Sequence, residues 1–200
     1  MYYWRQLTEK QREEVLDYRR TQHYPKHSPP HFDSDRELTY IITASCYEHK
    51  HIIGKSHHRL TDCEARLLSA CEKHCTAIYA WCILPNHYHL LIKTAVMKLL
   101  RKELGLFHGQ SSFQWNGEDN ARGRQVWHNC FERKMRSQRH FHASLNYVLN
   151  NAVHHGYAEK WQDWQWSSAT QYLEAVGPDR AREIWQEYPV KSYGSKWDVF

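Results

Sequence analysis

The sequence predicts an α+β domain whose elements follow the order β-α-β-β-α-β. Three observations support this prediction. Two apolar strand patterns are separated by only two residues, helical apolar stripes lie before and after that pair, and a further strand pattern stands at each end of the series. This order is the split βαβ or ferredoxin-like pattern, to which the sequence adds an extra C-terminal helix.

The strand predictions rest on runs of β-branched and aromatic side chains that are bounded by turn residues. The two central runs are joined by Pro85-Asn86, a connection so short that it predicts an antiparallel hairpin. The predicted strands cover residues 37–47, 77–84, 87–94 and a segment around 125–128 within 123–136.

The helix predictions rest on apolar positions that recur every three or four residues. Thr61 and Glu64 have the spacing of a capping box, which predicts that a helix begins there and continues to about Cys75. The other predicted elements are a helix over 95–107, a polar loop over roughly 108–122, and an extra helix over 139–155.

A chain of 200 residues has the length of one domain with extensions. At the N-terminus, Thr8 and Gln11 form a second capping-box pair, which predicts a short charged helix to about Arg20. The predicted organisation is an N-terminal extension over 1–36, a main domain over 37–156, and a Trp-rich tail over 157–200 that packs on the domain.

Composition excludes several protein classes. Apolar residues make up 41% of the chain, which argues against disorder. The sequence lacks an apolar signal segment at its start and any apolar run long enough to span a membrane. We therefore expect a cytoplasmic, nucleoid-associated protein with reduced thiols. Cys71 and Cys75 continue the apolar stripe of their helix, which favours buried thiols over a zinc site.

Positive charge is concentrated in one segment. The net charge is only +5, but residues 122–140 hold six basic side chains against a single acid, Glu132. This excess predicts contact with a polyanion, although a solvated, charge-rich hairpin explains the stretch equally well. The basic residues are Arg122, Arg124, Arg133, Lys134, Arg136 and Arg139.

A pair of histidines lies in the third predicted strand. Residues two apart in a strand point to the same face, so His87 and His89 share a face while Tyr88 points away from them. Two imidazoles on one face can hold a metal ion. An ordinary exposed pair on a half-buried strand is the alternative interpretation of this pattern.

The extra helix carries a candidate nucleophile. Its apolar residues form one helical stripe, and Tyr147 lies off that stripe, where it is available for chemistry. Asn151 follows one turn later on the same side as Tyr147, and His154 comes next. The alternative is a tyrosine that packs sideways on the sheet.

Three ordered blocks resemble a known family. The blocks WCILPNHYHLLI, NYVLNNAVHHGYA and WQWSSATQYL are similar to those of the bacterial REP-associated tyrosine transposases, within the HUH single-tyrosine transposase superfamily. The similarity extends from about Tyr40 to Leu173. Several motifs in the same order in one small chain are more specific than any one of them.

The resemblance implies a role for each matched residue. His87 and His89 match the pair that binds Mg²⁺ or Mn²⁺, Asn151 matches a third metal ligand, and Tyr147 matches the nucleophile. Ala152 is a departure, because relatives often carry proline at this position.

The resemblance also implies a reaction and a partner. The enzyme would cleave and rejoin single-stranded DNA that carries a REP-like hairpin, through a 5′-phosphotyrosine intermediate, as a monomer or a homodimer and without a membrane partner. The basic residues of 122–140 would contact DNA phosphates. Three alternatives stay open: a palindrome-binding protein of the same fold that does not cut, an RNA-binding domain, and a hydrolytic metalloenzyme.

Overall fold

The computed structural model describes residues 7–21, 36–191 and 193–194. The chain divides into two compact units, residues 1–32 and residues 33–200. None of the described helices combines the length and the apolar character that crossing a membrane requires.

In the first unit, helix α2 (Glu9–Thr21) begins directly after Thr8. The backbone N–H of Thr8 donates to Oε1 of Gln11 at 2.9 Å, and the backbone N–H of Gln11 donates to Oγ1 of Thr8 at 3.3 Å. Two backbone donors at the helix start are thereby satisfied reciprocally. The predicted capping box is confirmed.

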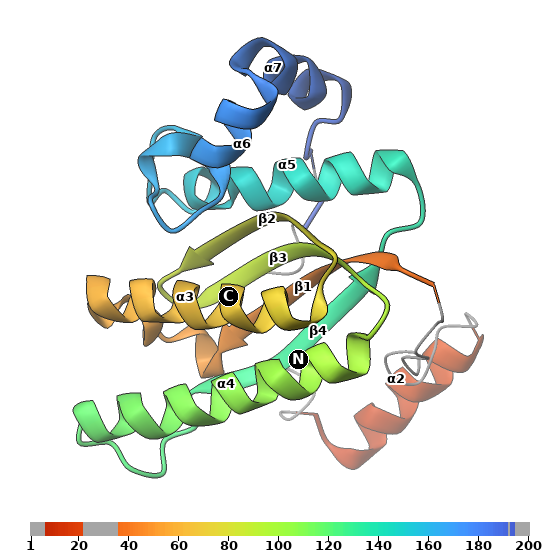
Figure 1. Ribbon diagram of the computed structural model, residues 1–200. Coiled ribbons are helices and arrows are strands. Elements are labelled where there is room, and N and C mark those ends of the chain that lie inside the picture. The colour runs from red at the N-terminus through yellow and green to blue at the C-terminus, as the bar shows by residue number, and fades with distance from the viewer. Residues whose placement is uncertain (1–6, 22–35, 192, 195–200) are drawn as a thin grey trace. The chain divides into compact units, whose positions relative to one another are not determined.

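The second unit contains a four-stranded sheet in the order β2-β3-β1-β4, in which all neighbouring strands are antiparallel (Figure 1). The predicted α+β, ferredoxin-like order is confirmed, and the strands over 77–84 and 87–94 match their predicted bounds. The strands are β1 (Leu38–Cys46), β2 (Ala77–Leu84), β3 (His87–Thr94) and β4 (Trp127–Lys134).

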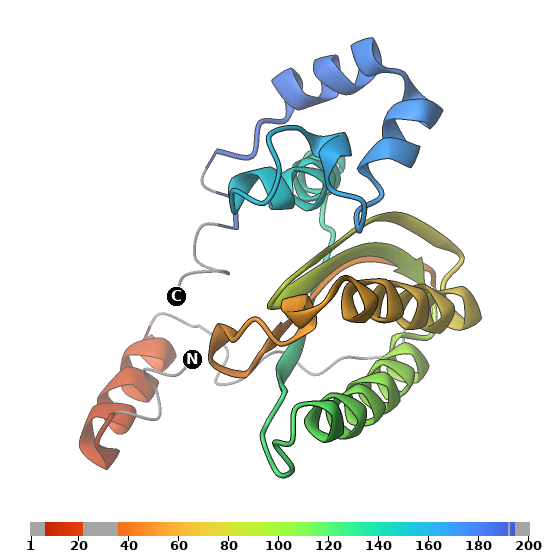
Figure 2. The ribbon, with the colours of Figure 1, turned by 90° about the vertical axis from the view of Figure 1, so that its left-hand side faces the viewer.

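Helices cover the two faces of the sheet differently, as Figure 2 shows from the side. Helices α3 and α4 pack on one face and bury a cluster that includes Tyr88 and Ile92. Helix α5 packs on the other face, over β2 and β3, and buries Ile41 and Leu91. The bounds are α3 (His57–His74), α4 (Met97–Glu118) and α5 (Gln138–His154).

The predicted loop over 108–122 is wrong, because α4 continues to Glu118. Its buried stripe continues from Phe107, the predicted end, through Ser111 and Trp115, at steps of four residues. The segment contains Gly109 and Gly117, and a glycine inside a helix lowers stability by roughly 1 kcal/mol. Burying a tryptophan stabilises the fold by more than one such glycine costs, and Trp115 is fully buried.

The predicted start of α3 is also wrong. Ser56 caps the helix by accepting from the backbone N–H of Arg59 at 3.2 Å, so the helix begins at His57. The side chains of the predicted capping pair accept indole N–H groups instead. Thr61 accepts from Trp166 at 3.1 Å, and Glu64 accepts from Trp81 at 2.8 Å.

A charged cluster fixes the end of α4 to the start of α3. The Arg59 guanidinium donates to Asp119 at 2.7 Å, and Lys55 and Arg124 lie 2.9 and 2.7 Å from the same carboxylate. Arg59 first, then Lys55 and Arg124, hold the pKa of Asp119 well below its usual range.

The chain after α5 returns to the edge strand β2. The backbone N–H of Trp81 donates to Oγ of Ser168 at 2.9 Å, and Ser167 bridges Cys82. The C-terminal elements are η3 (Trp161–Asp163), α6 (Ala169–Val176) and α7 (Pro178–Glu187). On the side of α5 away from the sheet, the Asn146 amide donates to the carbonyl of Tyr188, directly after α7, at 2.8 Å.

Candidate active site

The histidine pair lies on β3, on the face that α5 covers. His89 stands opposite Thr43 of β1 and Cys82 of β2. Tyr88 points to the opposite face, where its hydroxyl lies 3.0 Å from Nε2 of His108 in the core beneath α4. The predicted separation of Tyr88 from the two histidines is confirmed.

The His87 ring is oriented by the preceding turn. Nδ1 of His87 lies 2.7 Å from Oδ1 of Asn86, and Nδ2 of Asn86 donates to the carbonyl of His49 at 3.2 Å. Because the amide nitrogen is used on that carbonyl, the amide oxygen must face His87. Nδ1 is therefore the donor, and in the neutral ring Nε2 then carries the lone pair.

Asn151 of α5 faces that lone pair. Oδ1 of Asn151 lies 3.1 Å from Nε2 of His87, so two hydrogen-bond acceptors oppose each other. The Asn151 Nδ2 is buried and has no hydrogen-bond partner among the described residues. Rotating the amide would let Nδ2 donate to Nε2 but would leave Oδ1 buried in place of Nδ2. In the orientation that the structure shows, a cation between Nε2 and Oδ1 would accept a lone pair from each atom.

His89 is held in a similar way. Its Nδ1 lies 2.7 Å from Oγ1 of Thr43, and its Nε2 lies 3.3 Å from the hydroxyl of Tyr147. The centroids of the His87 and His89 rings are 4.9 Å apart. Metal-bound histidines commonly use one ring nitrogen for the metal and the other for a fixed partner, and both rings fit that pattern.

The donor set fits a divalent metal ion. In the part of the chain that the structure describes, no three His, Cys, Asp or Glu side chains gather around one point. A metal between β3 and α5 would therefore depend on the amide of Asn151 for its third protein ligand. Two imidazole nitrogens and one amide oxygen suit Mn²⁺ and can accept Mg²⁺.

A further histidine, His155, follows α5 directly, and sequence reasoning missed it. Tyr147, Asn151 and His155 come at four-residue steps, and the first two share one side of the helix. The His155 ring centroid lies 5.0 Å from that of His87, whereas His154 is exposed. The four-residue spacing from Asn151 to His155 is the sequence signal that could have identified this histidine.

Tyr147 is buried, contrary to the expectation that it lies open beside its helix. Only 3% of it is exposed. Tyr193 packs edge-on against it with the ring centroids 5.8 Å apart, and a Cβ added to Gly194 would fall 2.3 Å from Cε2 of Tyr147. The expectation was wrong because α5 is covered on two sides, so its apolar stripe does not define its exposed side.

The basic segment is divided in space. Arg122 stacks on the Phe113 ring at 4.3 Å, and Arg124 donates to Asp119 and to Asn116, all near the end of α4. The other four basic residues are exposed at the far end of β4 and the start of α5; they are Arg133, Lys134, Arg136 and Arg139.

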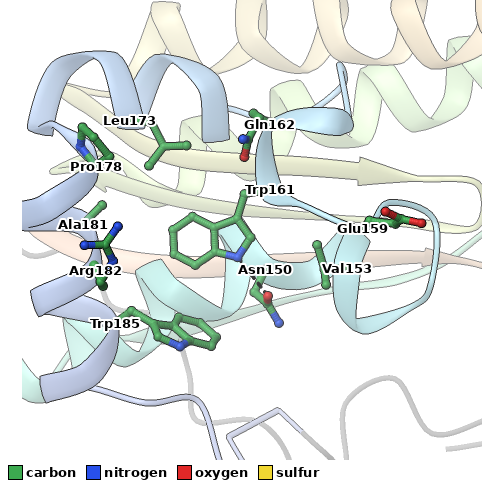
Figure 3. Close-up of a pocket in the computed structure, with 10 residues that line it drawn as sticks. All are labelled: Asn150, Val153, Glu159, Trp161, Gln162, Leu173, Pro178, Ala181, Arg182 and Trp185. Atoms are coloured by element: carbon green, nitrogen blue, oxygen red, sulfur yellow. Dashed lines mark hydrogen bonds between the residues drawn. The ribbon is translucent and has the colours of Figure 1, made fainter.

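A cavity of about 440 Å³ lies on another side of α5 (Figure 3). Trp161 and Trp185 line it, and Nε1 of Trp161 donates to Oδ1 of Asn150 at 2.9 Å. Neither histidine of the pair on β3 lines this cavity. It is therefore separate from the candidate active site.

Comparisons with known proteins support the resemblance seen in the motifs. No family model matches the chain. A protein of Haemophilus influenzae described as a REP-associated tyrosine transposase is 30% identical over 115 residues, which cover 49% of this chain and 61% of that relative. The chain thus spans about three fifths of the length of the curated relative it matches.

A solved structure shares the fold. It is a REP-associated tyrosine transposase bound to a REP hairpin, and the match has a TM-score of 0.52, covering 72% of this chain and 85% of that one. Sequence identity in this match is 14%, so it concerns the fold alone. The predicted resemblance to the REP-associated tyrosine transposases is thus confirmed, by a relative in sequence and by a match in fold.

Proposed function

We propose that this chain cleaves and rejoins single-stranded DNA that carries a hairpin, with Tyr147 as the nucleophile. The observation that carries the proposal is the position of the Tyr147 hydroxyl, 3.3 Å from Nε2 of His89 and one helical turn from Asn151. A hairpin substrate is supported by the solved relative, which is bound to a REP hairpin.

The proposed site would act by positioning the attacking oxygen and the phosphate. A phenol is a weak nucleophile because its ordinary pKa is about 10. The Tyr147 hydroxyl lies 3.3 Å from Nε2 of His89, so the phenolic oxygen stands between β3 and α5, beside the nitrogen that would bind the metal. His87, His89 and Asn151 would hold Mg²⁺ or Mn²⁺ there. Such an ion, when bound, withdraws charge from a phosphate and orients it for in-line attack.

The proposed step balances without another reactant. The Tyr147 oxygen attacks phosphorus, a phosphotyrosine bond to the 5′ side forms, and the bond from phosphorus to the 3′ oxygen breaks. The hydroxyl proton of Tyr147 is lost and the departing 3′ oxygen gains one, so a free 3′-OH is produced. Attack by that 3′-OH on the phosphotyrosine reverses the step and rejoins the strand.

The test compares Tyr147→Phe with the wild type on a labelled hairpin oligonucleotide. The substitution keeps the ring and its packing but removes the attacking oxygen. We expect a covalent band from the wild type in Mn²⁺, and equal binding without a covalent band from the variant. Tyr157→Phe is the matched control. Peptide mass spectrometry that finds the nucleotide on Tyr88 or Tyr157 would contradict the proposal.

The burial of Tyr147 favours a second candidate function, a hairpin-binding protein that does not cut. Tyr193 and Gly194 cover the ring that would have to reach phosphorus. This candidate predicts tight binding of hairpin DNA and no covalent band in Mn²⁺ or Mg²⁺. The same oligonucleotide experiment therefore separates the two functions.

A further inference from the structure

An aromatic side chain lies exposed on the sheet, on the same face as the histidine pair. Phe131 of β4 is 39% exposed. In the strand register, Thr43 of β1 stands opposite both His89 on one side and Phe131 on the other. Directly opposed residues of antiparallel strands share a face. His89, Thr43 and Phe131 therefore form one row across three strands.

The row brings Phe131 close to the candidate active site. Neighbouring strands lie about 4.8 Å apart, so the backbones at His89 and Phe131 are separated by roughly 10 Å. Helix α5 packs over β2 and β3, and β4 forms the opposite edge of the sheet. The Phe131 ring thus lies beside the proposed cleavage position and is open to solvent.

The charges around Phe131 favour a polyanion. Arg133 lies two residues further along β4, on the same face, and is exposed. Glu132 points to the opposite face, where its carboxylate lies 3.2 Å from Arg101 and its side chain is 3% exposed. On this face β4 therefore presents the Phe131 ring and the Arg133 guanidinium, while the Glu132 carboxylate lies on the opposite face.

We propose that Phe131 is the platform on which one unpaired base of the DNA stacks beside the scissile phosphate, with Arg133 contacting the adjoining backbone. The inference rests on the proposed function and names where its substrate is held. Bases stack on aromatic rings whatever their sequence, so this contact fixes the position of the strand without specifying its sequence.

The test measures binding of a hairpin with single-stranded flanks, in Tyr147→Phe protein without metal, so that cleavage plays no part. Phe131→Ala should weaken binding about 5- to 150-fold, the range for the loss of one stacked base, and Phe131→Trp should restore it. Phe113→Ala is the matched control, because Phe113 is 71% exposed on α4, on the other face; it should leave affinity unchanged.

A fluorescent base locates the contact. When 2-aminopurine is placed in turn at each flank position, one position should be quenched in the parent protein and recover in Phe131→Ala. The inference is overturned if Phe131→Ala binds like the parent, if no position recovers, or if Phe131 affects RNA but not DNA of the same sequence. Parent protein that binds no DNA would overturn the proposed function as well, whereas the first two results leave it intact.

Discussion

Nε2 of His87 lies 3.1 Å from Oδ1 of Asn151, and in a neutral His87 ring that donates from Nδ1 to Asn86, Nε2 is an acceptor just as Oδ1 is. Two lone pairs at this distance repel each other unless a cation lies between them. The pair therefore joins β3 to α5 through a contact that a bound metal would stabilise.

Metal binding should disappear when both histidines are removed. We expect His87→Ala/His89→Ala to lose Mn²⁺ binding in calorimetry and in electron paramagnetic resonance titrations, and to lose cleavage, while its circular dichroism stays that of a folded protein. His58→Ala removes an exposed histidine and serves as the control. Cleavage by the double variant in Mn²⁺ would contradict the assignment.

Asn86 should affect the affinity of the site for metal through the His87 ring, without binding the metal itself. Asn86→Ala removes the acceptor that fixes the His87 ring, and the loss of such partners typically lowers metal affinity about 10- to 100-fold. Asn86→Asp keeps an oxygen acceptor and should recover part of the affinity. Mn²⁺ titrations of both variants, at equal melting temperature, provide the measurement. Equal affinity for Ala and Asp would show that the ring needs no such partner.

The exposed basic residues should control salt dependence. We expect Arg133→Gln/Lys134→Gln/Arg136→Gln to weaken binding to every DNA and to make the slope of log affinity against log salt shallower by about 2, at roughly 0.7 per phosphate contact on single strands. Arg122→Gln/Arg124→Gln is the matched comparison, because those guanidinium groups contact Phe113 and Asp119. An unchanged slope in the triple variant would exclude phosphate contacts there.

The sequence predicted the features that depend on local pattern. β2 and β3 were predicted residue by residue because the Pro85-Asn86 turn fixes their ends, and strand alternation placed His87 and His89 on one face. Features that depend on distant neighbours were missed. The end of α4 depends on what buries Trp115, and the accessibility of Tyr147 depends on Tyr193 and Gly194, far along the chain.

Asp119 should stabilise the fold in a pH-dependent way. Asp119→Asn leaves the buried Arg59 with the Glu118 carboxylate and without that of Asp119, which should cost about 3 kcal/mol of unfolding free energy at pH 7, the low end for a broken buried pair. The folded pKa of Asp119 is lowered. Its contribution is therefore full above the unfolded pKa of about 3.9 and is lost as pH falls below it.

Denaturant unfolding of the two proteins at pH 7 and in the acid range checks this prediction. The difference in free energy should shrink as the solution is acidified. A difference that stays constant with pH would show that the Asp119 charge is not its source.

Gly194 should control access to Tyr147. Its φ is +79°, and a Cβ there would fall 2.3 Å from the Tyr147 ring, so Gly194→Ala should displace the covering segment. We expect faster nitration of Tyr147 by tetranitromethane, followed by peptide mass spectrometry. Gly123→Ala is the control, since its φ is +86° but a Cβ there meets nothing within 4 Å. Equal nitration in both variants would contradict the covering role.

The row from His89 through Thr43 to Phe131 ends at β4, an outer strand of the sheet. A strand of DNA laid along this row would approach sideways, over the rim of the sheet, and would not have to be threaded from a free terminus. A site of this kind can engage a looped-out stretch in the middle of a long or circular molecule. The substrate would then need to be locally unpaired, but it would not need to have an end.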